Sequence, residues 1–193
     1  MACYAIIAVR PPAEGKSRLA DALSLDRRVS LNYKLFRHVF AIAGDVINPG
    51  RIIVISRSEE LLREARAGGA EGHQERGNSL NEALTQGAGI AVSRGATEVL
   101  TLSSDLPFLE AEDLRAMFAA AGDIVIATDR RHIGTNAMLM RSPTSIPFRY
   151  GPESLAAHLA AAAEAGVAAT VVDRPGLARD IDVPSDLVEL ADR

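Results

Sequence analysis

The sequence predicts a three-layer α/β fold with a mainly parallel sheet, and three observations support this prediction. Short apolar runs alternate along the chain with stretches of helical periodicity. The links between them are short, and no low-complexity segment or internal repeat interrupts the order. A chain of 193 residues is long enough for one hydrophobic core, so residues 1–193 are expected to form a single domain.

Six short apolar runs are expected to form the strands. They are Tyr4–Val9, Ile52–Ser56, Glu98–Ser103, Asp123–Ala127, Ala137–Met140 and Ala169–Asp173. In a parallel α/β sheet ligands bind beyond the carboxyl ends of the strands. A site is therefore expected in the loops that follow Val9, Ser103, Ala127 and Val172.

Helices are expected between these strands, with their starts indicated by capping residues or proline. They are Asp26–Ala43, with Val29, Tyr33, Phe36 and Phe40 on its apolar stripe; a helix capped by Ser58 that ends at Ala67; one capped by Asn78 or Ser79 that ends near Arg94; Ala111–Ala121; one from Pro152 to Ala165; and Ser185–Ala191.

Composition excludes several classes of protein. The net charge of −4 argues against nucleic acid as the partner. A single cysteine, Cys3, excludes a disulfide framework and a cysteine-based zinc site, and it fits the cytoplasm. The first apolar run is too short for a signal peptide or a membrane span, so no membrane association is expected.

Several familiar motifs are incomplete or absent in this sequence. The segment RPPAEGKS resembles a phosphate-binding P-loop, but Arg10 occupies the first glycine position, and Pro11 and Pro12 remove two amide donors. No GxGxxG follows the first strand, no GxSxG occurs, and the four histidines have no metal-ligand spacing.

Three cations occupy the loop after the first strand. Arg10, Lys16 and Arg18 would lie at the carboxyl edge of the sheet, where they suit a triphosphate. An ordinary solvated loop is the alternative interpretation.

Three carboxylates have positions that favour a metal ion. Asp105 directly follows a buried strand, and Asp180 and Asp182 would face the same side of an extended segment. Magnesium prefers a few carboxylates together with water and substrate phosphates. A turn aspartate and a solvent-facing pair are the alternatives.

Two further stretches suit an anion. The first is Gly134-Thr135-Asn136, and the second is Gly151-Pro152-Glu153-Ser154, in which a glycine leads to a helix N-terminus. Simple helix capping is the alternative for the second.

Taken together, these pieces resemble the 2-phospho-L-lactate guanylyltransferase family, which makes the nucleotide-activated precursor of the deazaflavin coenzyme F-420. The resemblance runs from Ile6 to about Leu190. The stretches that carry it are AEGKSRL (13–19), NSLNEAL (78–84), LSSDLPFL (102–109), GTNAMLM (134–140) with PFRYGPESLAAH (147–158), and LARDIDVPSDL (177–187).

The resemblance implies a nucleotide-diphosphosugar transferase type of fold, which is Rossmann-like. It implies that the acid substrate is held at Thr135, Gly151 and Ser154, with Asn136 adjoining. It also implies Mg²⁺ at the three aspartates named above. Lys16 and Asn81 would lie on the GTP side.

The reaction expected from this resemblance is an in-line displacement. A phosphate oxygen of the acid attacks the α-phosphorus of GTP, and pyrophosphate leaves. No general base is required, because a phosphate monoester is largely ionised at neutral pH. Lys16 and Arg10, with Asp105 holding the metal, would carry the catalysis. A downstream transferase that takes the product is implied by the resemblance.

Two departures from the family pattern stand out. Arg10 replaces the usual lysine of a PVKP-like pattern, and the loop before GTN reads TDRRHIGTN, with additional cations. Members of the group use 2-phospholactate, phosphoenolpyruvate or 3-phosphoglycerate, and these residues do not choose among the three. The oligomeric state also stays open, a homodimer included.

Rival interpretations come from three classes. A molybdopterin or sugar-phosphate nucleotidyltransferase would share the fold and the aspartates. A non-catalytic nucleotide-binding protein would bind GTP without releasing pyrophosphate. A receiver-like signalling domain would place an acidic pair after the first strand, where this chain has Arg10-Pro11-Pro12.

Overall fold

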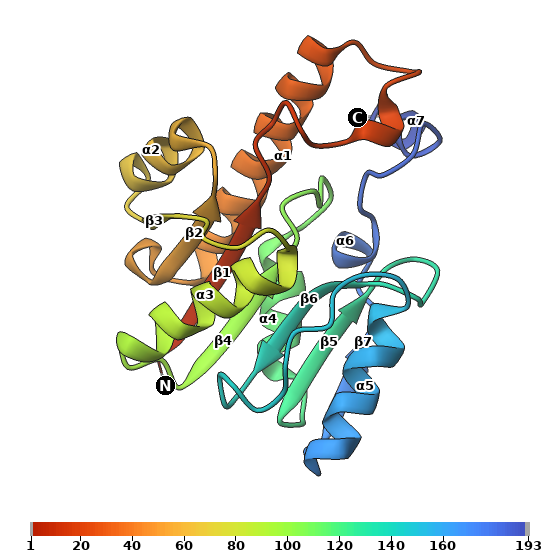
Figure 1. Cartoon of the computed structure of the whole chain (residues 1–193). Coiled ribbons are helices and arrows are strands. Elements are labelled where there is room, and N and C mark those ends of the chain that lie inside the picture. Colours follow the sequence, from red (N-terminus) through yellow and green to blue (C-terminus); the bar gives the residue numbers. More distant parts are fainter. Residues whose placement is uncertain (1, 192–193) are drawn as a thin grey trace.

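One seven-stranded sheet organises the protein in the computed structural model, which describes residues 2–191 (Figure 1). The strands lie in the order β3-β2-β1-β4-β6-β5-β7. Their bounds are β1 Cys3–Val9, β2 Ile52–Ser56, β3 Glu71–Gln74, β4 Glu98–Leu102, β5 Ile124–Thr128, β6 Thr135–Met140 and β7 Ala169–Val172. All neighbours pair in parallel except β6, which runs antiparallel to β4 and β5. The predicted mainly parallel α/β sheet is confirmed.

Helices cover both faces of this sheet, as predicted for three layers. They are α1 Leu25–Val46, α2 Glu59–Ala67, α3 Leu80–Ser93, α4 Ala111–Ala119, α5 Ser154–Ala165, α6 Pro175–Ala178 and α7 Asp186–Ala191, with short 3₁₀ turns at Ser17–Leu19 and Pro49–Arg51. Helices α1, α2 and α4 pack on one face, and α3 and α5 pack on the other.

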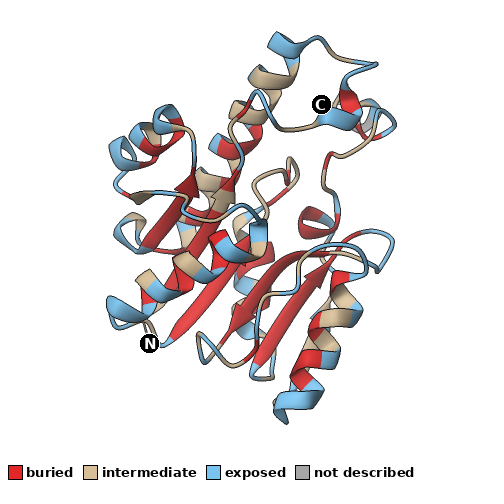
Figure 2. Ribbon diagram, viewed as in Figure 1, coloured by how far each residue is buried: buried red, intermediate tan, exposed pale blue. Residues whose placement is uncertain are grey.

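The alternation of side chains along the strands produces these two cores. In β1, Ala5 and Ile7 face α1, whereas Tyr4 and Ile6 face α3. Figure 2 shows the buried strands of the sheet; β2, β4, β5 and β6 are buried along their whole length, and β1 along most of it. Because both faces are covered, each large aliphatic side chain buried there contributes about 1.5–3 kcal/mol.

The apolar stripe of α1 differs from the prediction. The fully buried residues are Leu35, Phe36, Val39 and Ala43. Tyr33 and Phe40 are only partly buried and flank this stripe. Phe36, Val39 and Ala43 pack in the core with residues of β1 and β2, whereas Leu35 packs with Leu19 and Ile181.

Capping residues predicted the start of two helices correctly, but one helix start and one strand were not predicted correctly. The hydroxyls of Ser58 and Ser79 cap α2 and α3 as predicted. The prediction that Pro152 opens a helix was wrong, because Glu153 takes a left-handed conformation (φ 55°) and α5 begins only at Ser154. Strand β3 was not predicted. It has no apolar alternation and forms by pairing with β2.

Strands β1 to β4 end at one edge of the sheet, since they run in parallel. The loops that begin at Arg10, Arg57, Glu75 and Ser103 therefore meet there. Among residues 2–191, no helix has both the length and the apolar character needed to cross a bilayer.

Candidate active site

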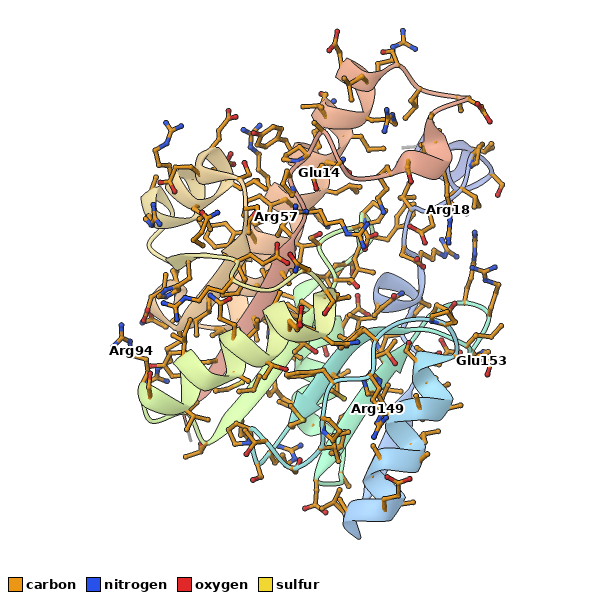
Figure 3. The ribbon with its side chains drawn as sticks, viewed as in Figure 1. Glu14, Arg18, Arg57, Arg94, Arg149 and Glu153 are labelled. Carbon is orange, nitrogen blue, oxygen red and sulfur yellow. The ribbon has the colours of Figure 1, made fainter. Side chains whose placement is uncertain are left out.

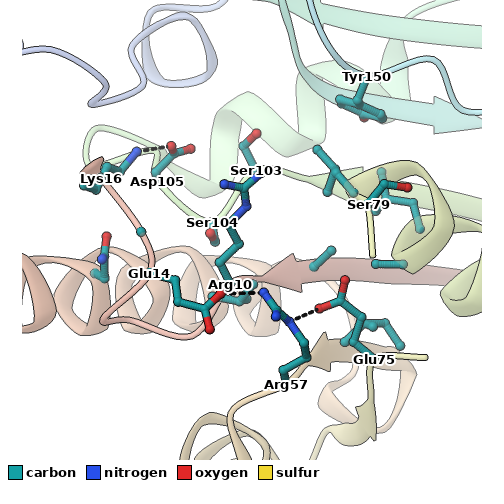
Figure 4. Close-up of a pocket in the computed structure, with 18 of the residues that line it drawn as sticks. Arg10, Glu14, Lys16, Arg57, Glu75, Ser79, Ser103, Ser104, Asp105 and Tyr150 are labelled. Atoms are coloured by element: carbon teal, nitrogen blue, oxygen red, sulfur yellow. Dashed lines mark hydrogen bonds and ion pairs between the residues drawn. The ribbon is translucent and has the colours of Figure 1, made fainter. Parts of the chain in front are cut away.

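A cavity of about 720 Å³ opens where these loops meet (Figure 4). One end holds Lys16 and Asp105, and the other holds Ser79 and Tyr150. Its polar lining includes Arg10, Glu14, Arg18, Arg57, Glu75, Asn78, Ser103, Ser104 and Asp182, and its apolar wall includes Ala8, Ile55, Ala83 and Leu84. A cavity of this size and mixed lining suits a small polar ligand.

Lys16 lies at one end of this cavity because its loop is held against α1. The Asn32 amide donates to the carbonyl of Pro12 at 2.7 Å, and Arg28 donates to the carbonyl of Gly15 at 3.3 Å. Lys16 itself has a left-handed backbone (φ 57°). Its side chain, only 8% exposed, points inward to the carboxylates of Asp105 and Asp182.

The Asp180–Asp182 segment reaches the site through its middle residue. Ile181 is 1% exposed and packs with Leu19 and Leu35. Its N–H donates to the carbonyl of Asp105 at 3.3 Å. The two aspartates on either side of Ile181 are thereby fixed next to Asp105.

The charges at this end of the cavity are unevenly balanced. Burial alone would lower the pKa of Lys16, but the charge of Asp105, and then that of Asp182, raises the pKa above its usual value. Burial raises the pKa of Asp180, and the like charges of Asp105 and Asp182 raise it further. The buried ammonium group of Lys16 contacts two of these carboxylates, Asp105 and Asp182, and Asp180 accepts from Asn136 instead.

This excess of negative charge fits a divalent cation. Oxygen ligands from carboxylates are the donors that magnesium prefers, and the pKa of Asp180 is raised first by burial and then by the like charges of Asp105 and Asp182. Within residues 2–191, however, no three His, Cys, Asp or Glu side chains are arranged as a ready metal cage, since Lys16 bridges Asp105 and Asp182. The metal site stays a prediction.

The other predicted nucleotide-side residues differ in position. Arg10 lines the cavity and makes no hydrogen bond or ion pair with another described residue. Arg18 also lines it, 71% exposed, 3.4 Å from Asp182. Asn81 is not part of the lining. Its amide group donates to the Tyr150 carbonyl at 3.0 Å and accepts from the Tyr150 N–H at 2.8 Å.

The predicted acid-side residues form a second, more buried group. Thr135 and Ser154 are buried, and Thr135 contacts His158 of α5 at 3.0 Å. Asn136 donates to the carbonyl of Leu177 at 2.9 Å and to Asp180 at 3.4 Å. This second bond links the group to the aspartates, although none of these side chains lines the cavity.

Gly151 provides the turn before α5 in this acid-side group. Its φ of 142° is one that residues with a Cβ rarely adopt. The turn is followed directly by Ser154 at the first position of the helix.

Arg57 and Glu75 are among the cavity residues that the sequence analysis did not predict. Arg57 pairs with Glu14 at 2.5 Å and with Glu75 at 3.3 Å, and Figure 3 shows Arg57 beside Glu14. Arg57 could have been found, since it directly follows the predicted strand Ile52–Ser56. Glu75 had no such signal, because strand β3 was itself missed.

Comparison with known proteins identifies the family of this chain. The chain matches the family described as guanylyl transferase CofC like over residues 3–191. It is 38% identical over 194 residues to a phosphoenolpyruvate guanylyltransferase of Rubrobacter xylanophilus, covering 98% of this chain and 94% of that protein. The same enzyme of Sphaerobacter thermophilus is 36% identical, covering 99% and 93%.

Solved structures share the fold at lower sequence identity. A Desulfovibrio desulfuricans protein assigned as a nucleotide-diphospho-sugar transferase superposes with a TM-score of 0.76 at 17% identity, covering 98% of this chain and 87% of that one. A nucleotidyl transferase from Methanothermobacter thermautotroptrophicus gives a TM-score of 0.69 at 19% identity, covering 99% and 96%. The family match over nearly the whole chain decides the assignment: the protein belongs to the guanylyl transferase CofC-like family and is a nucleotidyltransferase.

Proposed function

We propose that this enzyme transfers GMP from GTP to the phosphate of a small three-carbon acid and releases pyrophosphate, as a step in coenzyme F-420 biosynthesis. One observation carries the proposal. Lys16 contacts the carboxylates of Asp105 and Asp182 at one end of a cavity of about 720 Å³ that also presents arginines, and Asp180 lies within reach of the same charges. The names of the relatives favour phosphoenolpyruvate as the acid over 2-phospholactate and 3-phosphoglycerate.

The cavity suits a nucleotide along its length. Lys16, Arg10 and Arg18 in its lining offer cations for the phosphates of GTP. The apolar wall formed by Ile55, Ala83 and Leu84 suits the base.

Glu75 is our candidate for recognising guanine at the base end. Its side chain is 11% exposed, and within the described chain its Oε1 atom has no hydrogen-bond partner. A carboxylate accepts hydrogen bonds from the ring N–H and the amino group of guanine, whereas adenine has no ring N–H to donate on that edge.

The acid substrate would occupy the group around Thr135, Gly151 and Ser154, with Asn136 beside Asp180. Thr135 and Ser154 offer hydroxyl donors, and the residues after Gly151 lead into the N-terminus of α5. Free main-chain N–H groups and the dipole at such a terminus favour phosphate or carboxylate.

The proposed reaction needs no protein base. An ionised phosphate oxygen of the acid forms a bond to the α-phosphorus, and the bond from that phosphorus to the bridging oxygen of pyrophosphate breaks. Lys16 and Arg10 stabilise the charge on the departing pyrophosphate, and the acid-side group holds the nucleophile in line. Magnesium on Asp105, Asp180 and Asp182 would lower the repulsion between the anions.

The test is pyrophosphate release from purified protein with GTP and magnesium, with each of the three acids supplied separately. The partner transferase and its deazaflavin acceptor should be included, since products of this kind can be labile. We expect turnover with phosphoenolpyruvate. Folded protein that binds GTP and stays silent with all three acids would contradict the proposal and favour a binding protein or a different acceptor.

A further inference from the structure

A buried histidine joins the two halves of the acid-side group. His158 lies in α5 with 0% exposure. Its Nδ1 atom is 3.0 Å from Oγ1 of Thr135, and its Nε2 atom is 2.9 Å from the main-chain nitrogen of Arg149. The ring also packs against Tyr150, with 4.9 Å between the ring centroids. Thr135 and the segment before Gly151 are therefore held by the same imidazole.

These contacts decide which ring nitrogen carries the hydrogen. The main-chain N–H of Arg149 can only donate, so Nε2 must be the bare acceptor. Burial, and then the charge of Arg149, lowers the pKa of His158 to about 4, so the ring is neutral at pH 7. A neutral imidazole carries one hydrogen, which must then be on Nδ1.

The direction of the hydrogen bond to Thr135 follows from this. Nδ1–H donates to Oγ1, so the hydroxyl hydrogen of Thr135 cannot point at the ring. No other described residue accepts a hydrogen bond from this hydroxyl. Thr135 is 5% exposed, so its donor is both buried and unused. A buried donor without a partner is costly unless a ligand satisfies it.

We propose that His158 is a positioning residue that turns the hydroxyl hydrogen of Thr135 toward an anionic oxygen of the acid substrate. Through Nε2 it also fixes the Arg149–Gly151 segment on the other side of the same group. This proposal rests on the proposed binding of the acid at Thr135, Gly151 and Ser154.

The tautomer can be measured without any reaction. Nitrogen NMR of protein labelled at its histidines, with the His158 signals assigned from the His158→Gln spectrum, should show a protonated Nδ1 and a bare Nε2 at pH 7. The opposite tautomer, or a charged ring, would overturn the proposal even if the enzyme is fully active.

Two substitutions separate the roles of the two ring nitrogens. The amide of His158→Asn can place a donor near the position of Nδ1, which keeps the bond to Thr135 and loses the one to Arg149. The amide of His158→Gln can place an oxygen near the position of Nε2, which keeps the bond from Arg149 and loses the one to Thr135. Both variants should first be checked for an unchanged circular dichroism spectrum.

We expect His158→Gln to raise the KM for the acid about tenfold, and His158→Asn to change it less than about threefold, with the KM for GTP unchanged in both. Thr135→Val should raise the KM for the acid as much as His158→Gln does. The double variant should have nearly the same KM as either single variant, because both changes remove the same interaction. Equal effects of the two His158 variants on the acid KM, or an effect on the GTP KM instead, would refute the positioning role. A wild-type enzyme that releases no pyrophosphate would refute the proposed function, while the NMR measurement still decides the tautomer.

Discussion

The ammonium nitrogen of Lys16 lies 3.3 Å from a carboxylate oxygen of Asp182, 166 positions later in the chain. The same nitrogen donates to Asp105, 89 positions away. One buried cation thus joins the loop after β1, the loop after β4 and the segment before α7. Because neither partner is near Lys16 in sequence, the site depends on the packing that brings the three segments together.

Replacing Asp105 with Asn should abolish most of the activity and keep the fold. The main-chain carbonyl that accepts from Ile181 is unchanged, and the carboxylate bonds only Lys16 among the described residues. We expect turnover to fall at least about 100-fold, because the site loses the negative charge that positions Lys16 and the proposed magnesium ion. Pyrophosphate release and circular dichroism check this. Asp45→Asn, an exposed change in α1, should be neutral. Normal magnesium-dependent rates in Asp105→Asn would contradict the metal assignment.

Removing the charge of Arg10 should weaken binding of GTP. Arg10 lines the cavity and makes no hydrogen bond or ion pair with another described residue, so its loss breaks no such bond within residues 2–191. We expect Arg10→Ala to raise the KM for GTP about tenfold, and Arg10→Lys to recover part of it. Arg115→Ala on α4, where the side chain is 56% exposed, is the matched control. An unchanged KM in Arg10→Ala would remove this residue from the nucleotide site.

Changing Glu75 to Gln should reduce the preference for guanine. The neutral amide presents one oxygen acceptor where the carboxylate presents two, so guanine loses a charge-assisted bond that adenine never makes. The ratio of kcat/KM for GTP to that for ATP should fall about tenfold. Glu112→Gln, 69% exposed on α4, should leave the ratio unchanged. A ratio that does not move would place guanine recognition elsewhere.

Truncating Ile181 should damage both stability and activity. Its side chain is 1% exposed and packs with Leu19 and Leu35. We expect Ile181→Ala to lower the free energy of unfolding in urea by about 2–5 kcal/mol, and to lower turnover because Asp180 and Asp182 lose their anchor. Val188→Ala, at a position 65% exposed on α7, should cost less than about 0.5 kcal/mol. Full activity in a destabilised Ile181→Ala would show that the aspartates do not depend on this packing.

His158 should make the protein less stable as the pH falls from about 6.5 to about 4. Its pKa is lowered to about 4 in the folded chain from 6.5 in the unfolded chain, so the unfolded chain binds the proton first. Stability therefore rises with pH across this window, by at most about 3 kcal/mol. Asp180 has a raised pKa and acts in the opposite sense, so the difference between wild type and His158→Asn isolates the histidine. If the difference in free energy of unfolding between the two proteins stayed constant from about pH 4 to pH 6.5, the lowered pKa of His158 would be contradicted.

Local patterns predicted much of the fold because they record local physics. Ser58 and Ser79 cap helices with their own hydroxyls, and the apolar run of β2 was located to the residue. Strand β3 (EGHQ) could not be predicted, since its half-polar sequence becomes a strand only by pairing with β2. The prediction from Pro152 was wrong because Glu153, the next residue, has a left-handed backbone that its residue type does not indicate.

By itself, the sequence determined the alternation of strands and helices, the loops at the carboxyl edge, and the residue types at the site. Only the tertiary structure decided that Lys16 stands between Asp105 and Asp182 and that His158 faces Thr135. The burial of Ile181 and of the His158 ring fixes these pairs. Burial depends on surfaces that come together only when distant parts of the chain fold onto one sheet, so no local pattern can encode them.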